Sequence, residues 1–135
     1  MIKITDKPIS PQSVANRVKT SGSGCVVLYI GLIRDYSRNK AVLSVEYEDI
    51  DGTAENTLRQ IASEVKQKWA LNNIAIYHRV GKLKVGDVNL VIALASTHRQ
   101  DGFAACQYAI DRFKEKLPTR KKETYLDGSF AIEKR

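Results

Sequence analysis

The sequence predicts an α+β fold in which helices pack on a mainly antiparallel sheet. Short runs with apolar residues at every position or at every second position alternate with longer runs at helical spacing. Turn signals such as Asp127-Gly128 join neighbouring strand patterns, as in antiparallel hairpins. A chain that mixes hairpins with helices in this way is typical of the α+β class.

The first part of the chain predicts a strand, a helix and a long apolar strand. Residues 2–4 alternate as in a short strand, and Ser10 followed by Pro11 is a favourable helix start. Residues 25–33 are almost all apolar and rich in strand formers. They therefore predict a buried central strand.

A polar loop with three basic residues, residues 34–40, follows this apolar run. Beyond it, Leu43, Val45 and Tyr47 alternate with polar residues, which predicts a half-buried strand with these side chains inward. We expect the two strands to form a hairpin with a basic tip. Arg34 lies where the apolar strand meets the loop, a usual position for a binding residue, although an exposed loop arginine explains it equally well.

The middle of the chain predicts scaffold elements. The clearest helix pattern begins at about residue 54 and runs to Trp69, with apolar residues on one face and charged residues on the other. Residues 74–80 and residues 88–95 predict two further strands. His78 shares a face with apolar neighbours, and a histidine there is more often a hydrogen-bonded core residue than a catalyst.

The strand over residues 88–95 leads into a polar corner, Ser-Thr-His-Arg at residues 96–99. A helix pattern follows over about residues 100–117 and ends at Pro118. The first N–H groups of a helix are free and its N-terminus carries partial positive charge, so this corner favours an anion. His98 and Arg99 strengthen the prediction of a phosphate or carboxylate site there.

Six apolar residues of this helix fall on one stripe, which we expect to face the core. The stripe consists of Phe103, Cys106, Ala109, Ile110, Phe113 and Leu117. Lys114 and Lys116 lie on opposite borders of it. A border lysine can place its amine in a cleft, although a solvent-exposed lysine is the commoner case. Helical geometry alone does not choose between the two lysines.

Composition is ordinary for a soluble globular protein, with 43% hydrophobic and 27% charged residues. The length predicts one domain over residues 1–135. No apolar run approaches the roughly 18 residues of a membrane-spanning helix, and the first residues do not form a signal peptide, so we expect a cytoplasmic protein. Cys25 and Cys106 lie in apolar patterns and are expected to be buried.

The net charge of +7 implies an anionic partner. Six basic residues and one acid fall within residues 112–122. A basic nucleic-acid-binding module is therefore the alternative function to consider. Against it, Phe113 is the one aromatic residue of this run and belongs to the core stripe, whereas nucleic-acid binders interleave aromatic residues with basic ones.

No glycine-rich phosphate loop, metal-ligand cluster or Ser/His/Asp spacing is present. More specific blocks occur in order along the chain: GLIR at 31–34, VEYE at 45–48, YHRVGKLKVGD at 77–87, STHR at 96–99, FAAC at 103–106, AIDRFK at 109–114 and PTRKKE at 118–123. Together they resemble the catalytic (large) subunit of molybdopterin synthase. The resemblance covers nearly the whole chain from Cys25 onward. Arg120 departs from it, since the family usually has a large aromatic residue there.

The resemblance implies an α/β hammerhead fold and an enzyme, a sulfurtransferase of molybdenum cofactor biosynthesis. Members of the family convert cyclic pyranopterin monophosphate (precursor Z) to molybdopterin. The sulfur arrives on the thiocarboxylated C-terminal glycine of a small ubiquitin-like subunit, whose tail enters a pocket on the large subunit. The large subunit forms a homodimer with one small subunit at each end, a heterotetramer. No metal or other cofactor is expected for this step.

The resemblance also implies a set of substrate-binding residues. They are Arg34, His98, Arg99, Lys114, Lys121, Lys122 and Glu123. Of these, Arg34, His98 and Arg99 suit the cyclic phosphate electrostatically. Because the nucleophile comes from the partner, the chain itself has to supply charge and proton transfer.

Two lysines are the expected catalytic residues. We expect Lys121, crowded by Arg120 and Lys122, to be available as a neutral amine and to act as a base. The resemblance favours Lys114 over Lys116 as the second catalytic lysine. One further alternative stays open at this point, a non-catalytic relative that binds only the ubiquitin-like partner.

Overall fold

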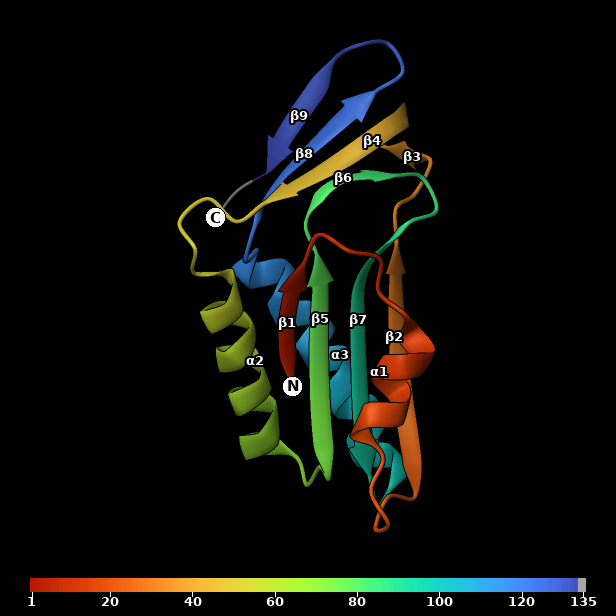
Figure 1. Cartoon of the computed structure of the whole chain (residues 1–135), viewed down its shortest axis with the longest axis vertical. Coiled ribbons are helices and arrows are strands. Elements are labelled where there is room, and N and C mark those ends of the chain that lie inside the picture. The colour runs from red at the N-terminus through yellow and green to blue at the C-terminus, as the bar shows by residue number, and fades with distance from the viewer. Residues whose placement is uncertain (134–135) are drawn as a thin grey trace.

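The computed structural model describes residues 1–133, which form three helices and nine strands in two sheets (Figure 1). In chain order the elements are β1 Ile2–Thr5, α1 Pro11–Val18, β2 Cys25–Leu32, β3 Tyr36–Ser37, β4 Lys40–Glu48, α2 Ala54–Lys68, β5 Asn73–Arg79, β6 Gly81–Lys84, β7 Val88–Ser96, α3 Arg99–Lys116, β8 Arg120–Tyr125 and β9 Phe130–Glu133. Among these strands every pair is antiparallel except β1 with β5. The predicted α+β class with a mainly antiparallel sheet is confirmed.

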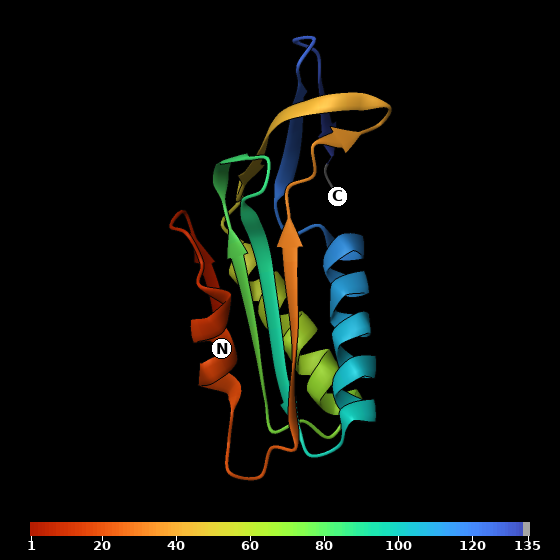
Figure 2. The same cartoon turned by 90° about the vertical axis from the view of Figure 1, so that its right-hand side faces the viewer.

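The first sheet has the strand order β1-β5-β7-β2 and carries helices on both faces (Figure 2). On one face α2 and α3 pack over a buried cluster that includes Ile92 and Phe113. On the other face α1, which begins at Pro11 as expected, buries Val14 and Val18. The predicted packing of helices on a sheet is therefore confirmed.

The second sheet lies across the end of the first sheet at which β2 and β5 finish and β7 begins (Figure 1). Its strand order is β3-β4-β8-β9, and β6 also pairs with β4. Val45, Leu83 and Tyr125 belong to a separate buried cluster beneath it. The predicted hairpin turn is confirmed: it joins β8 to β9, and Gly128 has a φ of 88°, which glycine adopts without a steric penalty.

β2 is an edge strand, so the expectation that residues 25–33 form a central strand is wrong. Within the described residues β2 pairs only with β7. Leu28, Ile30 and Leu32 are 37%, 42% and 57% exposed. An apolar strand sequence indicates that both faces can be buried, but it does not say which surface buries them.

The expected hairpin between β2 and β4 is also wrong, because these two strands belong to different sheets. Instead, the basic loop folds into a tight hairpin of β3 with β4. Arg38 and Asn39 form its turn with φ values of 52° and 62°, as a two-residue hairpin turn requires. A register shift between Val42 and Ser44 then turns Leu43 outward, contrary to its predicted inward position.

The core-facing side of α3 is rotated from the predicted stripe. Cys106, Ala109 and Phe113 of the predicted stripe are buried as expected. Phe103 is instead 63% exposed, and Gly102 and Ala105, which lie outside the stripe, are buried. A Cβ atom at Gly102 would lie 2.9 Å from the Ser96 hydroxyl, so the helix backbone approaches the sheet closely. Small residues permit this close approach. The predicted stripe was based on large apolar side chains and therefore did not include Gly102 and Ala105. None of the helices described in the structure is long and apolar enough to cross a membrane.

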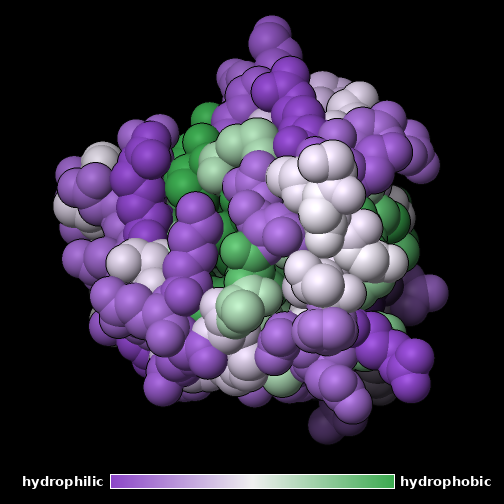
Figure 3. Space-filling view, turned by 90° about the horizontal axis from the view of Figure 1, so that it is seen from below, coloured by the Kyte–Doolittle hydropathy of each residue, from purple (hydrophilic) through white to green (hydrophobic). Residues whose placement is uncertain are grey.

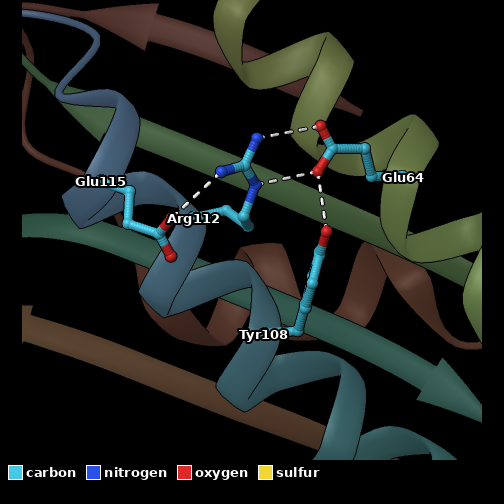
Figure 4. A network of polar contacts seen from close by, with 4 residues as sticks. All are labelled: Glu64, Tyr108, Arg112 and Glu115. Atoms are coloured by element: carbon cyan, nitrogen blue, oxygen red, sulfur yellow. Dashed lines mark hydrogen bonds and ion pairs between the residues drawn. The ribbon is translucent and has the colours of Figure 1, made fainter.

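A polar network on the surface joins α2 to α3 (Figure 4). The Arg112 guanidinium donates hydrogen bonds to both carboxylate oxygens of Glu64, at 2.9 and 3.3 Å, and a further bond to Glu115. The Tyr108 hydroxyl donates to the same Glu64 carboxylate. The hydrogen bonds from Arg112 are the main cause of a Glu64 pKa below its ordinary value. This network links α3 to α2 at the surface, above the apolar cluster that the two helices share.

Candidate functional site

A cavity of about 730 Å³ lies where the end of the first sheet, the C-terminal end of α3 and the second sheet meet. It is termed the junction cavity below. Its lining residues are Tyr29, Gly31, Leu32, Arg34, Ser37, Arg38, Tyr47, Asn89, Leu90, Phe113, Lys114, Leu117, Lys121, Glu123 and Glu133.

The lining of the junction cavity divides into an apolar part and a charged part. The first sheet and α3 contribute apolar and aromatic side chains, including Tyr29, Leu90 and Phe113. The charged lining residues are four cations, Arg34, Arg38, Lys114 and Lys121, and two acids, Glu123 and Glu133. This arrangement suits a ligand that combines a negative charge with a flat, weakly polar body.

Strand β8 presents alternate side chains to the junction cavity. Lys121 and Glu123 line it, whereas the intervening Lys122 points away and lies over the Phe130 ring at 4.7 Å. The structure therefore does not place Lys122 with the other expected substrate-binding residues. A run of three charged residues on a strand cannot direct all its side chains to the same face.

Glu123 is the best-connected polar residue of the site. Its Oε1 accepts hydrogen bonds from the Ser37 hydroxyl at 2.9 Å and from the Tyr125 hydroxyl at 2.8 Å. The Lys121 ammonium lies 3.5 Å from Oε2. Burial raises the pKa of Glu123, but the hydrogen bonds from Tyr125 and Ser37 together with Lys121 outweigh it and hold this pKa below its ordinary value.

The expected crowding of Lys121 by cations is wrong. Arg120 lies on the other face of β8 and donates to the Glu48 carboxylate at 2.7 Å. Lys122 is on that outer face as well. Lys121 instead has an acidic neighbour, Glu123, which fixes the direction of its amine.

The structure separates the two border lysines of α3. Lys114 lines the junction cavity beside Phe113 and Leu117. Lys116 lies toward α2, where its charge contributes to the lowered pKa of Glu64. The preference for Lys114, which helical geometry alone could not give, thus has a structural basis.

His98 and Arg99 lie at the opposite end of α3 from the junction cavity. The helix spans 18 residues, which corresponds to roughly 27 Å at 1.5 Å per residue. At this far end they line a separate hollow with Gly24, Cys25, Thr97 and Gln100. Within one chain, the structure therefore does not bring His98 and Arg99 together with Arg34.

The end of the molecule at which α3 begins is largely hydrophilic, with a narrow hydrophobic strip across it (Figure 3). Cys25 is only partly buried here, contrary to expectation, whereas Cys106 is buried as expected. The Cys25 thiol lies 3.4 Å from the Ser96 hydroxyl, which in turn donates to the His98 carbonyl. Within residues 1–133, no group of three His, Cys, Asp or Glu side chains could hold a metal ion.

Sequence reasoning missed several residues of the junction cavity. Arg38 reaches it from the β3–β4 turn, and Tyr29, Tyr47 and Asn89 line it from three strands. One signal was available for Asn89, which is the one polar residue in the apolar run 88–95. The aromatic residues gave no such signal, because they fit ordinary strand patterns.

His78 is completely buried behind the junction cavity, which confirms its predicted place in the core. Its Nδ1 lies 2.9 Å from the Asn89 carbonyl and its Nε2 lies 2.9 Å from the Thr119 hydroxyl. Since a carbonyl only accepts, Nδ1 carries the proton and Nε2 accepts from Thr119. The ring also makes edge contacts with Tyr47 and Phe113, two lining residues of the cavity.

A family model described as MoaE protein matches residues 4–116 of the chain. The chain belongs to the MoaE family. The molybdopterin synthase catalytic subunit of Nostoc sp. is 38% identical over 127 residues, which cover 93% of this chain and 77% of that protein. The catalytic subunit from Homo sapiens is 37% identical over 129 residues, 96% of this chain and 69% of that protein.

Solved structures agree with this family membership. The crystal structure of molybdopterin synthase from Staphylococcus aureus matches this MoaE-family chain with a TM-score of 0.89 at 32% identity, covering 98% of this chain and 96% of that chain. The resemblance inferred from sequence blocks is confirmed. The comparisons give no support to the alternative of a nucleic-acid-binding module.

The buried imidazole makes stability depend on pH in a defined window. Burial lowers the pKa of His78 from 6.5 to about 4. Between these values the unfolded chain binds a proton that the folded chain does not, so stability falls as the pH is lowered through the window and is constant above it. We expect a loss of up to about 3 kcal/mol by pH 4, measured as urea unfolding midpoints across a pH series.

The matched comparison uses the two histidines. His78→Gln should be less stable at pH 7 and should lack most of the loss between pH 6.5 and 4. His98→Gln, at an exposed position, is the matched control for the loss of a histidine. An unchanged profile in His78→Gln would show that the buried imidazole is not the titrating group.

Proposed function

We propose that this chain is the catalytic subunit that converts precursor Z to molybdopterin with sulfur from a thiocarboxylated small subunit. The observation that carries the proposal is the convergence of Arg34, Lys114, Lys121 and Glu123 on the junction cavity of a MoaE-family fold. The four residues come from a loop, a helix and a strand, and Arg34 lies 80 residues before Lys114 in the sequence. The cavity is formed by both sheets, so we treat residues 1–135 as one functional unit.

The cavity supplies charge and proton transfer. A cyclic phosphate and a terminal thiocarboxylate are both anions, and four lining cations attract them. No cysteine lines the described cavity, in keeping with a sulfur nucleophile that arrives on the partner's tail. Lys121, oriented by Glu123, transfers protons to or from the reacting pterin side chain. Lys114, at the end of α3, contacts the thiocarboxylate tail and the developing charge.

Assembly into a homodimer would complete the site. In an antiparallel pairing of two β2 edges about a two-fold axis, the Cys25 end of one strand meets the Leu32 end of the other. The strand is roughly 23 Å long, close to the length of α3. This pairing brings His98 and Arg99 of a second copy toward the junction cavity of the first. The exposed Ile30 is buried in the same contact.

The edge strand β9 is then available to the small subunit. β9 is the outer strand of the second sheet, and Glu133 at its end lines the junction cavity. Phe130 is 57% exposed on this strand, and Lys122 lies over its ring. We assign this surface to the ubiquitin-like subunit, and Lys122 to that contact rather than to substrate. Two such contacts on a homodimer give the heterotetramer.

The cytoplasm is the proposed location. Cys25 and Cys106 are both free thiols in the structure. Free cysteines are usual in a reducing compartment.

The lysines provide the direct test of this function. In a reconstituted reaction with precursor Z and saturating thiocarboxylated small subunit, the parent should form molybdopterin in single turnovers. Lys121→Ala and Lys114→Ala should each lower the rate by about 10²–10⁴, because each removes a proton-transfer or charge-stabilising group. Lys116→Ala is the matched control on the same helix and should react at the parental rate.

Binding and folding controls separate the possible failures. All three variants should keep the parental melting temperature and oligomeric state. An unreactive parent would refute the catalytic assignment and favour a non-catalytic relative that binds the partner alone. Full activity in Lys121→Ala, or equal losses in the Lys116 and Lys114 variants, would refute the assignment of roles.

The β2 edge is tested by placing a charge on it. Ile30→Lys should convert the homodimer to a monomer, because an unpaired ammonium would be buried in the contact. Light scattering at micromolar concentration measures the change. Leu43→Lys, at a similarly exposed apolar position on the second sheet, should remain dimeric. A monomeric parent would contradict the proposed assembly.

A composite site predicts complementation between two defective variants. Arg34→Ala and His98→Ala should each weaken substrate binding by roughly 1.5–3 kcal/mol, the value of a charged hydrogen bond. A heterodimer with one copy of each variant has one intact site and one doubly defective site, so it should recover about half the parental activity. No recovery would show that the two residues do not meet across the dimer.

A further inference from the structure

Two of the uncharged polar side chains that line the junction cavity are hydrogen-bonded to each other. They are Tyr47 of β4 and Asn89 of β7. The Asn89 side-chain amide donates a hydrogen bond of 2.9 Å to the Tyr47 hydroxyl. The pair therefore bridges the two sheets at the inner wall of the cavity, next to the aromatic residues Tyr29 and Phe113.

The pair keeps unused hydrogen-bonding capacity. An asparagine amide has two N–H donors and a carbonyl acceptor, and one N–H is used by Tyr47. Among the described residues, no hydrogen bond occupies the Asn89 Oδ1 atom. Burial raises the pKa of Tyr47 to about 12, so its hydroxyl keeps its hydrogen and can donate it to a ligand.

Gly31 permits a close approach of this pair to β2. A Cβ atom built on Gly31 would lie 2.9 Å from Asn89 Oδ1 and 3.2 Å from Cε2 of the Tyr29 ring. Any larger residue would push one of these two side chains away. The absence of a Cβ atom at this point therefore lets the Asn89 amide and the Tyr29 ring pack closely against the β2 backbone, which fixes their positions in the cavity wall.

We propose that Tyr47 and Asn89 form the subsite that recognises the pyrimidinone ring of a pterin. The ring is flat and neutral, with an amino group, a ring N–H and a carbonyl along one edge. Asn89 Oδ1 accepts a hydrogen bond from the amino edge, and the Tyr47 hydroxyl donates to the ring carbonyl. The charged residues at the other part of the cavity are then left to the phosphate and the thiocarboxylate. This inference deepens the proposed function and rests on it.

Asn89 and Tyr47 are assigned to different groups of the pterin ring, so their contributions to binding can be measured separately. The test measures dissociation constants by ligand fluorescence for two phosphate-free probes, pterin and lumazine, which carries an oxygen in place of the 2-amino group. The parent should bind pterin several-fold more tightly than lumazine, because lumazine leaves the Asn89 acceptor unpaired. Asn89→Leu should bind pterin roughly three- to tenfold more weakly and lose this preference.

Tyr47→Phe has a different expected result. This substitution removes the hydroxyl that donates to the ring carbonyl, and both probes carry that carbonyl. Tyr47→Phe should therefore weaken the binding of pterin and of lumazine by a similar factor of about three to ten, and the preference for pterin should remain. A general loss of structure would not produce these two distinct patterns. Tyr77→Phe, on the α1 side of the first sheet and outside the cavity, is the matched control and should bind both probes as the parent does.

The outcomes are decisive in either direction. A parent that prefers pterin, together with the two patterns above, supports the subsite. A parent that binds pterin, with Tyr47→Phe and Asn89→Leu both binding like the parent, overturns the subsite and leaves the proposed function standing. A parent that binds neither pterin nor precursor Z overturns both. Tyr47→Phe, as the smaller change, carries the test if Asn89→Leu does not fold.

Discussion

The joint between the two sheets depends on one buried imidazole. His78 contacts β7 through the Asn89 carbonyl, the start of β8 through Thr119, and the rings of Tyr47 and Phe113. Both of its nitrogens are hydrogen-bonded, which a fully buried ring requires. Because these contacts fix the positions of β4, β7, α3 and β8 relative to one another, they also fix the walls of the junction cavity.

Around this joint, the one buried charge among the described lining residues, Glu123, is hydrogen-bonded to Ser37 and Tyr125. The neutral pair Tyr47 and Asn89 lies on the inner wall, where an unpaired charge would be costly. The cations are more exposed, and Lys121 has an oriented acidic neighbour in Glu123. A pocket organised in this way can hold a flat ring deeply while its reactive and phosphorylated parts stay near cations. Catalysis by positioned charge needs this kind of preorganisation more than it needs a nucleophile.

Two of the edge strands in the described sheets, β2 and β9, expose large apolar side chains. β2 presents Leu28 and Ile30 to solvent, and β9 presents Phe130. Unpaired, apolar edges promote association, and monomeric proteins usually protect them with charge or with short strands. The same edges flank the two ends of the functional surface, β2 beside Arg34 and β9 beside Glu133. The proposed assembly and the proposed activity therefore involve the same structural features.

The short strands β3 and β6 were not predicted, but the sequence by itself determined the types of most elements, the start of α1, the final hairpin, the buried role of His78 and the family. These follow from local periodicity, turn chemistry and ordered motif blocks, which act over short stretches of chain. Sheet order, the outward rotation of Phe103, the choice of Lys114 over Lys116 and the separation of His98 from Arg34 were decided only by the tertiary structure. Each of these features depends on contacts between segments that are far apart in the sequence. An apolar strand such as β2 has the same sequence pattern whether it lies in the centre of a sheet or at an edge. Asn89 shows both kinds of information. The sequence shows that a polar residue interrupts the apolar strand, but only the tertiary structure shows that its side chain is hydrogen-bonded to Tyr47.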